Sequence, residues 1–230
     1  MITCPVCGGS NNDLAVVCVA CRSYLQAKVD TLDLFSTVWG LIESPGTAFR
    51  RILLATHKNY VVLLAAMLGI ASVYALLWMK NLGSQFENIM SLALPGILYG
   101  PFVGILLTLL LALALVAMGR GPGGRLSLKN AFAVIAYASV PIACSLVFVF
   151  PAEVALFGVY FFGNNPPPAV INPVAYFILV GLDAAAVLWS FLLLVQAMRV
   201  GVGVSLWRAA TTVCGVAGVT GGIAAVAWLV

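Results

Sequence analysis

Charge is scarce in this sequence. Of its 230 residues, 8% are charged and 63% are hydrophobic, and the mean hydropathy is +1.12. A soluble domain carries roughly 25% charged residues, so eleven Lys and Arg with seven Asp and Glu cannot cover a water-facing surface. The scarcity of charge excludes a soluble globular enzyme, and the high hydrophobicity excludes a disordered chain. The net charge of +4 is too small to indicate nucleic-acid binding.

Motifs of catalysis are missing as well. The sequence contains one histidine, His57, and it has no Ser/His/Asp set, phosphate-binding glycine loop, paired carboxylates or His-Glu-x-x-His helix. Its first residues lack the basic and apolar regions of a cleavable signal peptide, so the first span is expected to act as the targeting signal. We therefore predict a membrane protein that is not an enzyme.

Five stretches are long and apolar enough to cross a bilayer, which takes about 20 helical residues. They are residues 60–79, 97–118, 130–150, 174–198 and 209–230. The apolar stretch 152–162 is too short to cross alone and is interpreted as an extension of the third span or an interfacial piece. The predicted fold class is all-α, with five transmembrane helices, and Pro101 and Pro141 should kink or interrupt their helices.

The basic residues predict the orientation. Ten of the eleven Lys and Arg residues fall on one side of the five spans, and only Lys80 falls on the other. Because cytoplasmic loops are enriched in Lys and Arg, the N-terminus is expected in the cytoplasm. An odd number of spans then places the C-terminus outside.

Four cysteines near the start of the chain predict a metal site. Cys4, Cys7, Cys18 and Cys21 form two C-x-x-C pairs that are separated by ten residues. Four thiolates suit one structural zinc ion in a closed tetrahedron that leaves no position for catalysis. Residues 1–27, called the head below, are thus predicted to be a zinc ribbon that folds on its metal, since so short a segment cannot build a core.

Other uses of these cysteines are a redox dithiol, an iron site and a pair of disulfides. A cytoplasmic location argues against disulfides, and no thioredoxin-like pattern surrounds either pair. Within the head, Gly8 allows a tight turn, Asn11 to Asp13 is the expected turn of a hairpin, and Leu14 to Val17 is an expected strand. Arg22 stands where zinc ribbons often have glycine.

Residues 28–58 are predicted to form an amphipathic helical linker. Leu32, Phe35, Trp39 and Ile42 recur at spacings of three and four, as on one face of a helix. Ser44-Pro45 then starts a second helix. Helices of this kind lie on an anionic membrane surface. Alternatively, the linker helices pack on the transmembrane bundle, and the two arrangements can occur together. The residues expected at the membrane interface are Phe35, Trp39, Phe49, Arg50, Arg51 and Lys58.

The remaining residues, 59–230, make up the predicted membrane domain. Gly96, Gly100 and Gly104 are spaced by four and predict a close helix–helix contact, either within the bundle or between protomers of an oligomer. The same spacing occurs again at Gly218 and Gly222. These glycines do not distinguish a monomer from a homo- or hetero-oligomer.

One acid lies within a predicted span. Because a charge in the bilayer is costly, Asp183 should face the protein interior, be protonated or meet a cavity. Tyr137, Tyr99 and Ser139 are possible partners. Asp183 and Tyr137 are therefore a candidate intramembrane polar site. The site either couples protons or ions to transport or has a purely structural role.

Several segments together resemble the Ypt/Rab-interacting protein (Yip) family of five-span membrane proteins. They are residues 42–52, with the pattern P-x-x-x-F-R-x-I, the glycine-rich loop 123–129 that leads to Tyr137-x-x-x-Pro141, residues 188–209, and Tyr99-Gly100-Pro101. The family's aspartate before the last motif is absent. The resemblance implies a five-span fold, and prokaryotic members of the family have a zinc ribbon ahead of it. Eukaryotic members bind Rab-type GTPases, a role that should not be transferred to a prokaryotic chain.

The function expected from these features is that of a scaffold or adaptor in a prokaryotic inner membrane. Its partners would be the lipid bilayer and proteins not identified by the sequence, with no nucleic acid. One alternative is a small-molecule, ion or lipid transporter with a cavity near Asp183, Tyr137 and Pro141. Another is an accessory subunit of a larger membrane complex.

Overall fold

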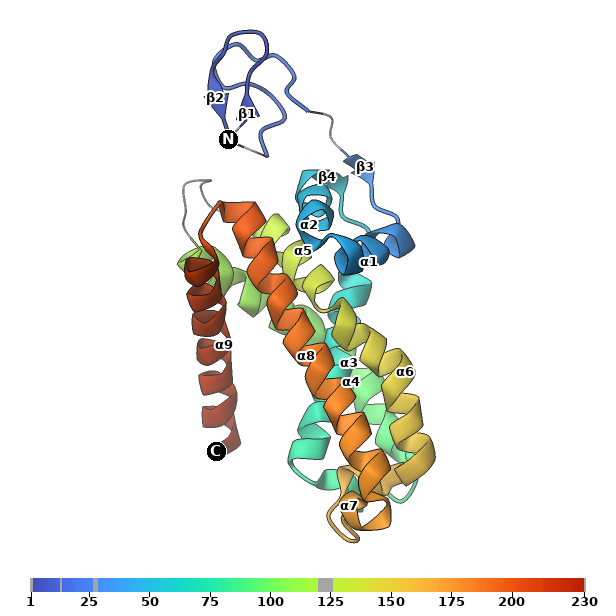
Figure 1. Cartoon of the computed structure of the whole chain (residues 1–230). Coiled ribbons are helices and arrows are strands. Elements are labelled where there is room, and N and C mark those ends of the chain that lie inside the picture. Colours follow the sequence, from blue (N-terminus) through green and yellow to red (C-terminus); the bar gives the residue numbers. More distant parts are fainter. Residues whose placement is uncertain (1, 13, 27–28, 120–125, 230) are drawn as a thin grey trace. The chain divides into compact units, whose positions relative to one another are not determined.

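The computed structural model describes the backbone of residues 2–12, 14–26, 29–119 and 126–229, and the side chains of these residues except 29–30 and 219–229 (Figure 1). Within this part of the chain, four helical segments are long and apolar enough to cross a membrane. The predicted cytoplasmic residues Lys28, Arg120 and Arg125, and most of the glycine-rich loop, lie outside the described residues.

Three spans follow the predicted ones, and the second and third of them extend beyond the predicted bounds. They are α3 (Val61–Met79), α4 (Ile89–Met118) and α8 (Pro173–Val202). The fifth predicted span falls on α9 (Leu206–Leu229). Because part of α9, with Gly222, lies outside the described side chains, the number of five spans stays a prediction.

The third span consists of two helices. α5 (Leu128–Ala138) ends before Ser139, and α6 (Val140–Phe157) begins there with Pro141 in its first turn, a position where the missing N–H of proline does no harm. The 3-10 turn η2 (Gly158–Phe162) continues α6, so the stretch 152–162 extends the third span. In α4, by contrast, the helix is continuous through Pro95 and Pro101.

The chain divides into two compact units, which are described separately. Unit 1 comprises residues 1–60, 111–134 and 193–230, and unit 2 comprises residues 61–110 and 135–192. The described Lys and Arg residues other than Lys80 all belong to segments of unit 1. The charge asymmetry of the sequence therefore coincides with a division of the fold.

Short stretches of strand pairing organise the head, within unit 1. β1 (Ile2–Thr3) pairs antiparallel with β2 (Ser10–Asn11), and Val17 forms an isolated antiparallel bridge with Tyr24. The predicted hairpin between the pairs is wrong, because the strands β1 and β2 close around the first C-x-x-C pair and residues 14–16 form no strand. A turn does begin at Asn12, whose carbonyl accepts from the N–H of Ala15 at 2.9 Å, and Asp13 lies outside the described residues. Each pair of cysteines is thus enclosed by its own antiparallel contact.

The linker of unit 1 is a pair of helices between two parallel strands. β3 (Val29–Thr31) pairs with β4 (Ala55–His57), and α1 (Leu34–Glu43) and α2 (Pro45–Leu54) connect them. Asp33 caps α1 by accepting a 2.8 Å hydrogen bond from the N–H of Ser36. Ser44 precedes Pro45 at the start of α2, as the sequence predicts.

Small residues bring α2 against the end of α8 in the same unit. A Cβ atom on Gly46 would lie 3.2 Å from Nε2 of Gln196, and one on Gly201 would lie 3.4 Å from Cδ1 of Leu53. The linker therefore packs on the protein through α2.

Unit 2 is held together by an aromatic core. Tyr74 of α3 stacks on Phe150 of α6 with ring centroids 4.3 Å apart, and Phe162 of η2 lies 6.1 Å from the Tyr74 ring. The turn η1 (Leu82–Gln85) meets η2 so closely that a Cβ atom on Gly83 would lie 2.3 Å from the carbonyl oxygen of Val159. The short helix α7 (Pro168–Ile171) leads into α8.

Candidate functional site

The two C-x-x-C pairs of the head fold into matching turns. The N–H of Gly8 donates to the carbonyl of Cys4 at 2.9 Å, and the N–H of Arg22 donates to the carbonyl of Cys18 at 3.0 Å. Gly8 and Arg22 both have positive φ angles, 70° and 59°. Arg22 thus adopts at the second turn the left-handed backbone that glycine adopts at the first, at a steric cost that glycine avoids.

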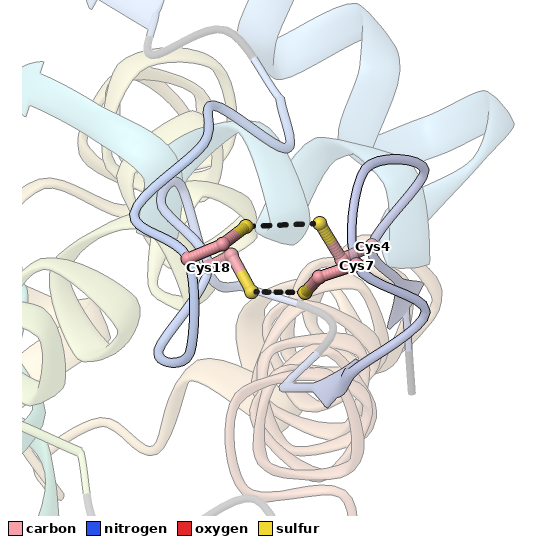
Figure 2. Close-up of side chains that lie close together, drawn as sticks. Cys4, Cys7 and Cys18 are labelled. Carbon is pink, nitrogen blue, oxygen red and sulfur yellow. Dashed lines mark hydrogen bonds between the residues drawn. The ribbon is translucent and has the colours of Figure 1, made fainter.

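These turns bring four sulfur atoms to one place. Cys4 and Cys21 lie 3.6 Å apart, sulfur to sulfur, and so do Cys7 and Cys18. Figure 2 shows the sulfur atoms of the two turns directed toward one another across the gap between the loops. All four ligand atoms lie within 4.8 Å of one another.

The spacing of the sulfurs fits a tetrahedral metal ion. A zinc–sulfur bond of about 2.3 Å implies sulfur–sulfur edges of about 3.8 Å in a regular tetrahedron, close to the 3.6 Å of both pairs. Two sulfurs come from each turn, and Cys4 and Cys18 are buried whereas Cys7 and Cys21 are exposed. The four cysteines can therefore bind one metal ion at the surface of the head.

Two polar residues that the sequence did not suggest support the cysteines. Asn11 is buried; its amide donates to the carbonyl of Gly9 at 2.8 Å and to the sulfur of Cys18 at 3.5 Å, and its oxygen accepts from the N–H of Val19 at 2.9 Å. Asn11 thus connects the first turn to the second. Ser23 lies within hydrogen-bond distance of the sulfurs of Cys4 (3.1 Å) and Cys21 (3.0 Å). Such outer groups orient metal ligands.

Hydrogen bonds from Ser23 and from backbone N–H groups give the thiols different pKa values. The Ser23 hydroxyl lowers the pKa of Cys4 to about 6, and the N–H of Cys21 lowers the pKa of Cys18. The N–H of Gly9 lowers the pKa of Cys7, but the three neighbouring sulfurs outweigh it and raise that pKa to about 12. All four cysteines can therefore be deprotonated together only beside a cation, and a bound divalent metal ion would supply that positive charge.

The linker presents a row of large apolar side chains outward. On α1, Phe35 is 78% exposed, Trp39 is 53% exposed and Ile42 is 56% exposed. Thr37 and Leu41, on the other side of the same helix, are buried. Of the stripe predicted from the sequence, Leu32 is buried, whereas the other three residues are exposed. We call Phe35, Trp39 and Ile42 the α1 face.

Phe49 and Lys58 correct the expected set of interfacial residues. Phe49 is fully buried, because it lies on the side of α2 that packs inward with Ile52 and Leu53. Lys58 directs its amine to the end of α2, donating to the carbonyls of Ile52 at 2.5 Å and Ala55 at 3.3 Å. Burial, with a smaller contribution from Lys129, lowers the pKa of Lys58 to about 8. Lys58 therefore caps a helix instead of facing headgroups.

Arg50 and Arg51, in contrast, are both exposed on α2. Their charges are available to the surroundings of the linker, although Arg50 also donates to the side-chain oxygen of Gln26 at 3.1 Å. The described interfacial candidates are thus the α1 face and these two arginines.

The three spaced glycines of α4 lie against α3 in unit 2. A Cβ atom on Gly104 would lie 1.9 Å from the carbonyl oxygen of Ala65, and one on Gly100 would lie 2.6 Å from Cγ1 of Ile70. One on Gly96 would lie 2.3 Å from the ring of Tyr74. The close approach is therefore internal to the chain, the first of the two possibilities that the spacing left open.

Asp183 finds a partner other than the expected ones. It accepts a short hydrogen bond from the hydroxyl of Ser145 on α6. Tyr137 is fully buried but is absent from the described lining of the cavity around Asp183, and Tyr99 is 60% exposed. The Ser139 hydroxyl donates to the carbonyl of Ala136 at 2.8 Å. The described lining of the cavity at Asp183 thus does not include Tyr137.

Asp183 instead faces a second acid that sequence reasoning missed. Glu153 of α6 is 4% exposed. Both carboxyl groups line a cavity of about 300 Å³ within unit 2. The expectation that paired carboxylates are absent is therefore wrong. Ser145 and Glu153 are eight residues apart, a little over two helical turns, so a continuous α6 was the signal that could have revealed the shared face.

Comparison with known proteins assigns the chain to a family. No curated protein and no solved structure matches it. The family model of the Yip1 domain matches residues 39–229, which include both linker helices from Trp39 onward and every described span. The chain therefore belongs to the Yip1 domain family of membrane proteins, with a four-cysteine head ahead of the domain.

Proposed function

We propose that this protein is a membrane adaptor, without enzymatic activity, whose head binds zinc and a protein partner in the cytoplasm. The orientation follows the positive-inside rule, since the described basic residues other than Lys80 lie in segments of unit 1 together with the head. The membrane would be the inner membrane of a prokaryotic cell, with the C-terminus outside.

The observation that carries this proposal is the surface of the head. Val6 and Val19 are 71% and 86% exposed at the tips of the two cysteine turns, and Tyr24 is 83% exposed nearby in the sequence. Exposed apolar side chains on a small rigid module are typical of a protein-binding surface. A closed four-sulfur site would hold this surface in shape and leave no coordination position for catalysis.

Deleting residues 1–27 should abolish the recovery of cytoplasmic partners. The full-length and truncated proteins are crosslinked in cells, purified from the membrane at equal amounts and compared by quantitative mass spectrometry. The membrane domain stays in both proteins, so lipid and transmembrane contacts are matched. An unchanged set of partners would contradict the adaptor function.

The α1 face would rest in the membrane interface. Large aromatic residues favour the boundary between acyl chains and headgroups, and Arg50 and Arg51 would meet anionic lipid there. The face would thereby hold the linker at the bilayer while α2 packs on the protein.

A photoactivatable lipid should therefore label Phe35 and Trp39 when the protein is in nanodiscs that contain anionic lipid. Labelled residues are identified by mass spectrometry of the segment 34–43. Tyr24 of the head, which is at least as exposed as either residue, serves as the control and should stay unlabelled. Equal labelling of Tyr24 and the α1 face would refute the interfacial placement.

A second candidate function is transport of a small molecule, ion or lipid through unit 2. The cavity that contains Asp183 and Glu153 favours it, because ionisable residues within membrane spans mark pathways or binding sites for polar ligands. Flux in proteoliposomes that Asp183→Asn removes would support transport, and equal flux in the variant and the wild type would count against it.

A further inference from the structure

We infer that the cavity of unit 2 binds a small organic cation with N–H donors, a primary ammonium ion attached to an apolar body. This inference rests on the second candidate function above and is independent of the adaptor proposal. It names the class of ligand and adds Glu153 as the residue that would hold the ligand's nitrogen.

The first step is the charge of the cavity. Glu153 and Asp183 both line the cavity, so the site carries negative charge whenever either carboxyl group is ionised. The described lining residues include no Lys, Arg or His to neutralise it. A monovalent cation would balance the site when one of the two carboxyl groups is ionised.

The second step is an acceptor that lacks a donor. Glu153 is buried, and its Oε1 atom has no hydrogen-bond partner among the described residues. An unsatisfied buried oxygen of a carboxyl group is unfavourable. Asp183 is already satisfied on one side by the hydroxyl of Ser145. An N–H group placed in the cavity would supply the missing donor to Oε1, which a quaternary ammonium ion cannot do.

The third step is the wall of the cavity. Five aromatic residues line it, namely Tyr74, Trp78, Phe150, Phe161 and Phe162. Aromatic faces attract cations and also accommodate apolar groups. The volume of about 300 Å³ lies at the small end of ligand pockets. A hydrated or many-coordinate metal ion fits poorly, because Ca²⁺ takes 6–8 oxygen ligands and Mg²⁺ keeps several waters.

An ammonium group can reach such a site as a free amine or as part of a phosphatidylethanolamine headgroup. The chemistry at Glu153 is the same in both cases. A phosphate next to the ammonium would lack a positive partner among the described lining residues. The experiment below separates the two sources by the composition of the bilayer.

The test uses the full-length protein in phosphatidylcholine nanodiscs and benzylammonium as the probe, with binding measured by calorimetry. Benzyl alcohol, which has the same ring without charge, and tetramethylammonium, which has charge without N–H, should each bind at least about tenfold more weakly. Benzylammonium binding no tighter than that of benzyl alcohol would overturn the inference. So would equal binding of benzylammonium and tetramethylammonium.

Variants test the assigned residue. Glu153→Gln preserves the shape of the side chain and should weaken benzylammonium binding by roughly tenfold or more. Glu87→Gln, the same change at an exposed position of unit 2, is the matched control and should bind like the wild type. Asp183→Asn should also lose binding, which provides a second variant if Glu153→Gln does not fold. Unchanged binding in a folded Glu153→Gln protein would overturn the inference.

Two further measurements distinguish the source of the ammonium group and test whether the ligand is transported. Weaker benzylammonium binding in phosphatidylethanolamine nanodiscs would identify the headgroup as a competing ligand, and equal binding in both bilayers would identify a free amine; either result supports a primary ammonium site. Binding without flux in proteoliposomes would contradict transport as a function while leaving the site established.

Discussion

Replacing Cys18 by serine is expected to empty the metal site and unfold the head. Cys18 is buried, faces Cys7 at 3.6 Å and accepts a hydrogen bond from Asn11. Without a ligand from the second turn, the strand contacts of the head, a pair of two-residue strands and one isolated bridge, would have no common anchor. Metal binding contributes about 10–16 kcal/mol of apparent free energy in zinc-finger peptides at pH 7, far more than these contacts do.

Zinc content and proteolysis measure this effect together. The wild-type protein should contain about one zinc per chain and resist cleavage in the head, whereas Cys18→Ser should contain almost none and be cleaved there. Cys144→Ser is the matched control, since Cys144 is exposed on α6 and far from the head in the sequence. Zinc content that stays the same in Cys18→Ser would remove Cys18 from the ligand set.

The site also predicts a dependence on pH. The pKa of Cys7 is raised to about 12 by its sulfur neighbours when the site holds no metal, whereas that of Cys4 is lowered to about 6. Zinc must displace the proton of Cys7, so binding should release protons and weaken as the pH falls.

The second large effect is expected from Gly104→Leu in α4. A Cβ atom at this position would lie 1.9 Å from the carbonyl oxygen of Ala65 and 2.7 Å from the backbone nitrogen of Gly69. The obstacle is backbone, which cannot rotate away, so α3 and α4 must separate. Overpacking typically costs 1–3 kcal/mol, and we expect a loss of about 3 kcal/mol, at the upper end of that range.

Thermal unfolding in detergent, followed by size exclusion, checks this value. Tm should fall by roughly 5–10 °C for a loss of that size. Gly181→Leu makes the same change on α8 in the same unit, where a Cβ atom would meet nothing within 4 Å, and it should leave Tm nearly unchanged. Equal stability of the two variants would show that the spacing of Gly96, Gly100 and Gly104 does not hold α3 against α4.

Much of the fold could be predicted because the bilayer imposes strong rules on sequence. The spans 60–79, 97–118 and 174–198 fall on α3, α4 and α8, because length and hydropathy locate a span, although α4 begins eight residues earlier than predicted. The break at Ser139 followed from Pro141. The hairpin of the head was misplaced, because two-residue strands carry almost no sequence pattern and are set by the geometry of the cysteine turns.

The site residues were harder to predict for a related reason. Phe49 and Phe35 are the same residue type, and both lie on apolar helix faces. Only the tertiary packing shows that Phe49 of α2 is buried and that Phe35 of α1 is exposed. Glu153 was overlooked because residues 152–162 were judged too short to cross. Its importance depends on α6 continuing past Phe150 and on Asp183 of α8 lining the same cavity, a tertiary arrangement that no local pattern specifies.

The proposed adaptor function requires that the surface of the head, and not its metal alone, binds a cytoplasmic partner. The direct test is in-cell crosslinking of the full-length protein with Val6→Asp and Val19→Asp, substitutions at exposed side chains that are not ligands. We expect the variant to keep about one zinc per chain and to lose the partners that deletion of residues 1–27 removes. Retention of those partners by the zinc-loaded variant would contradict the adaptor function.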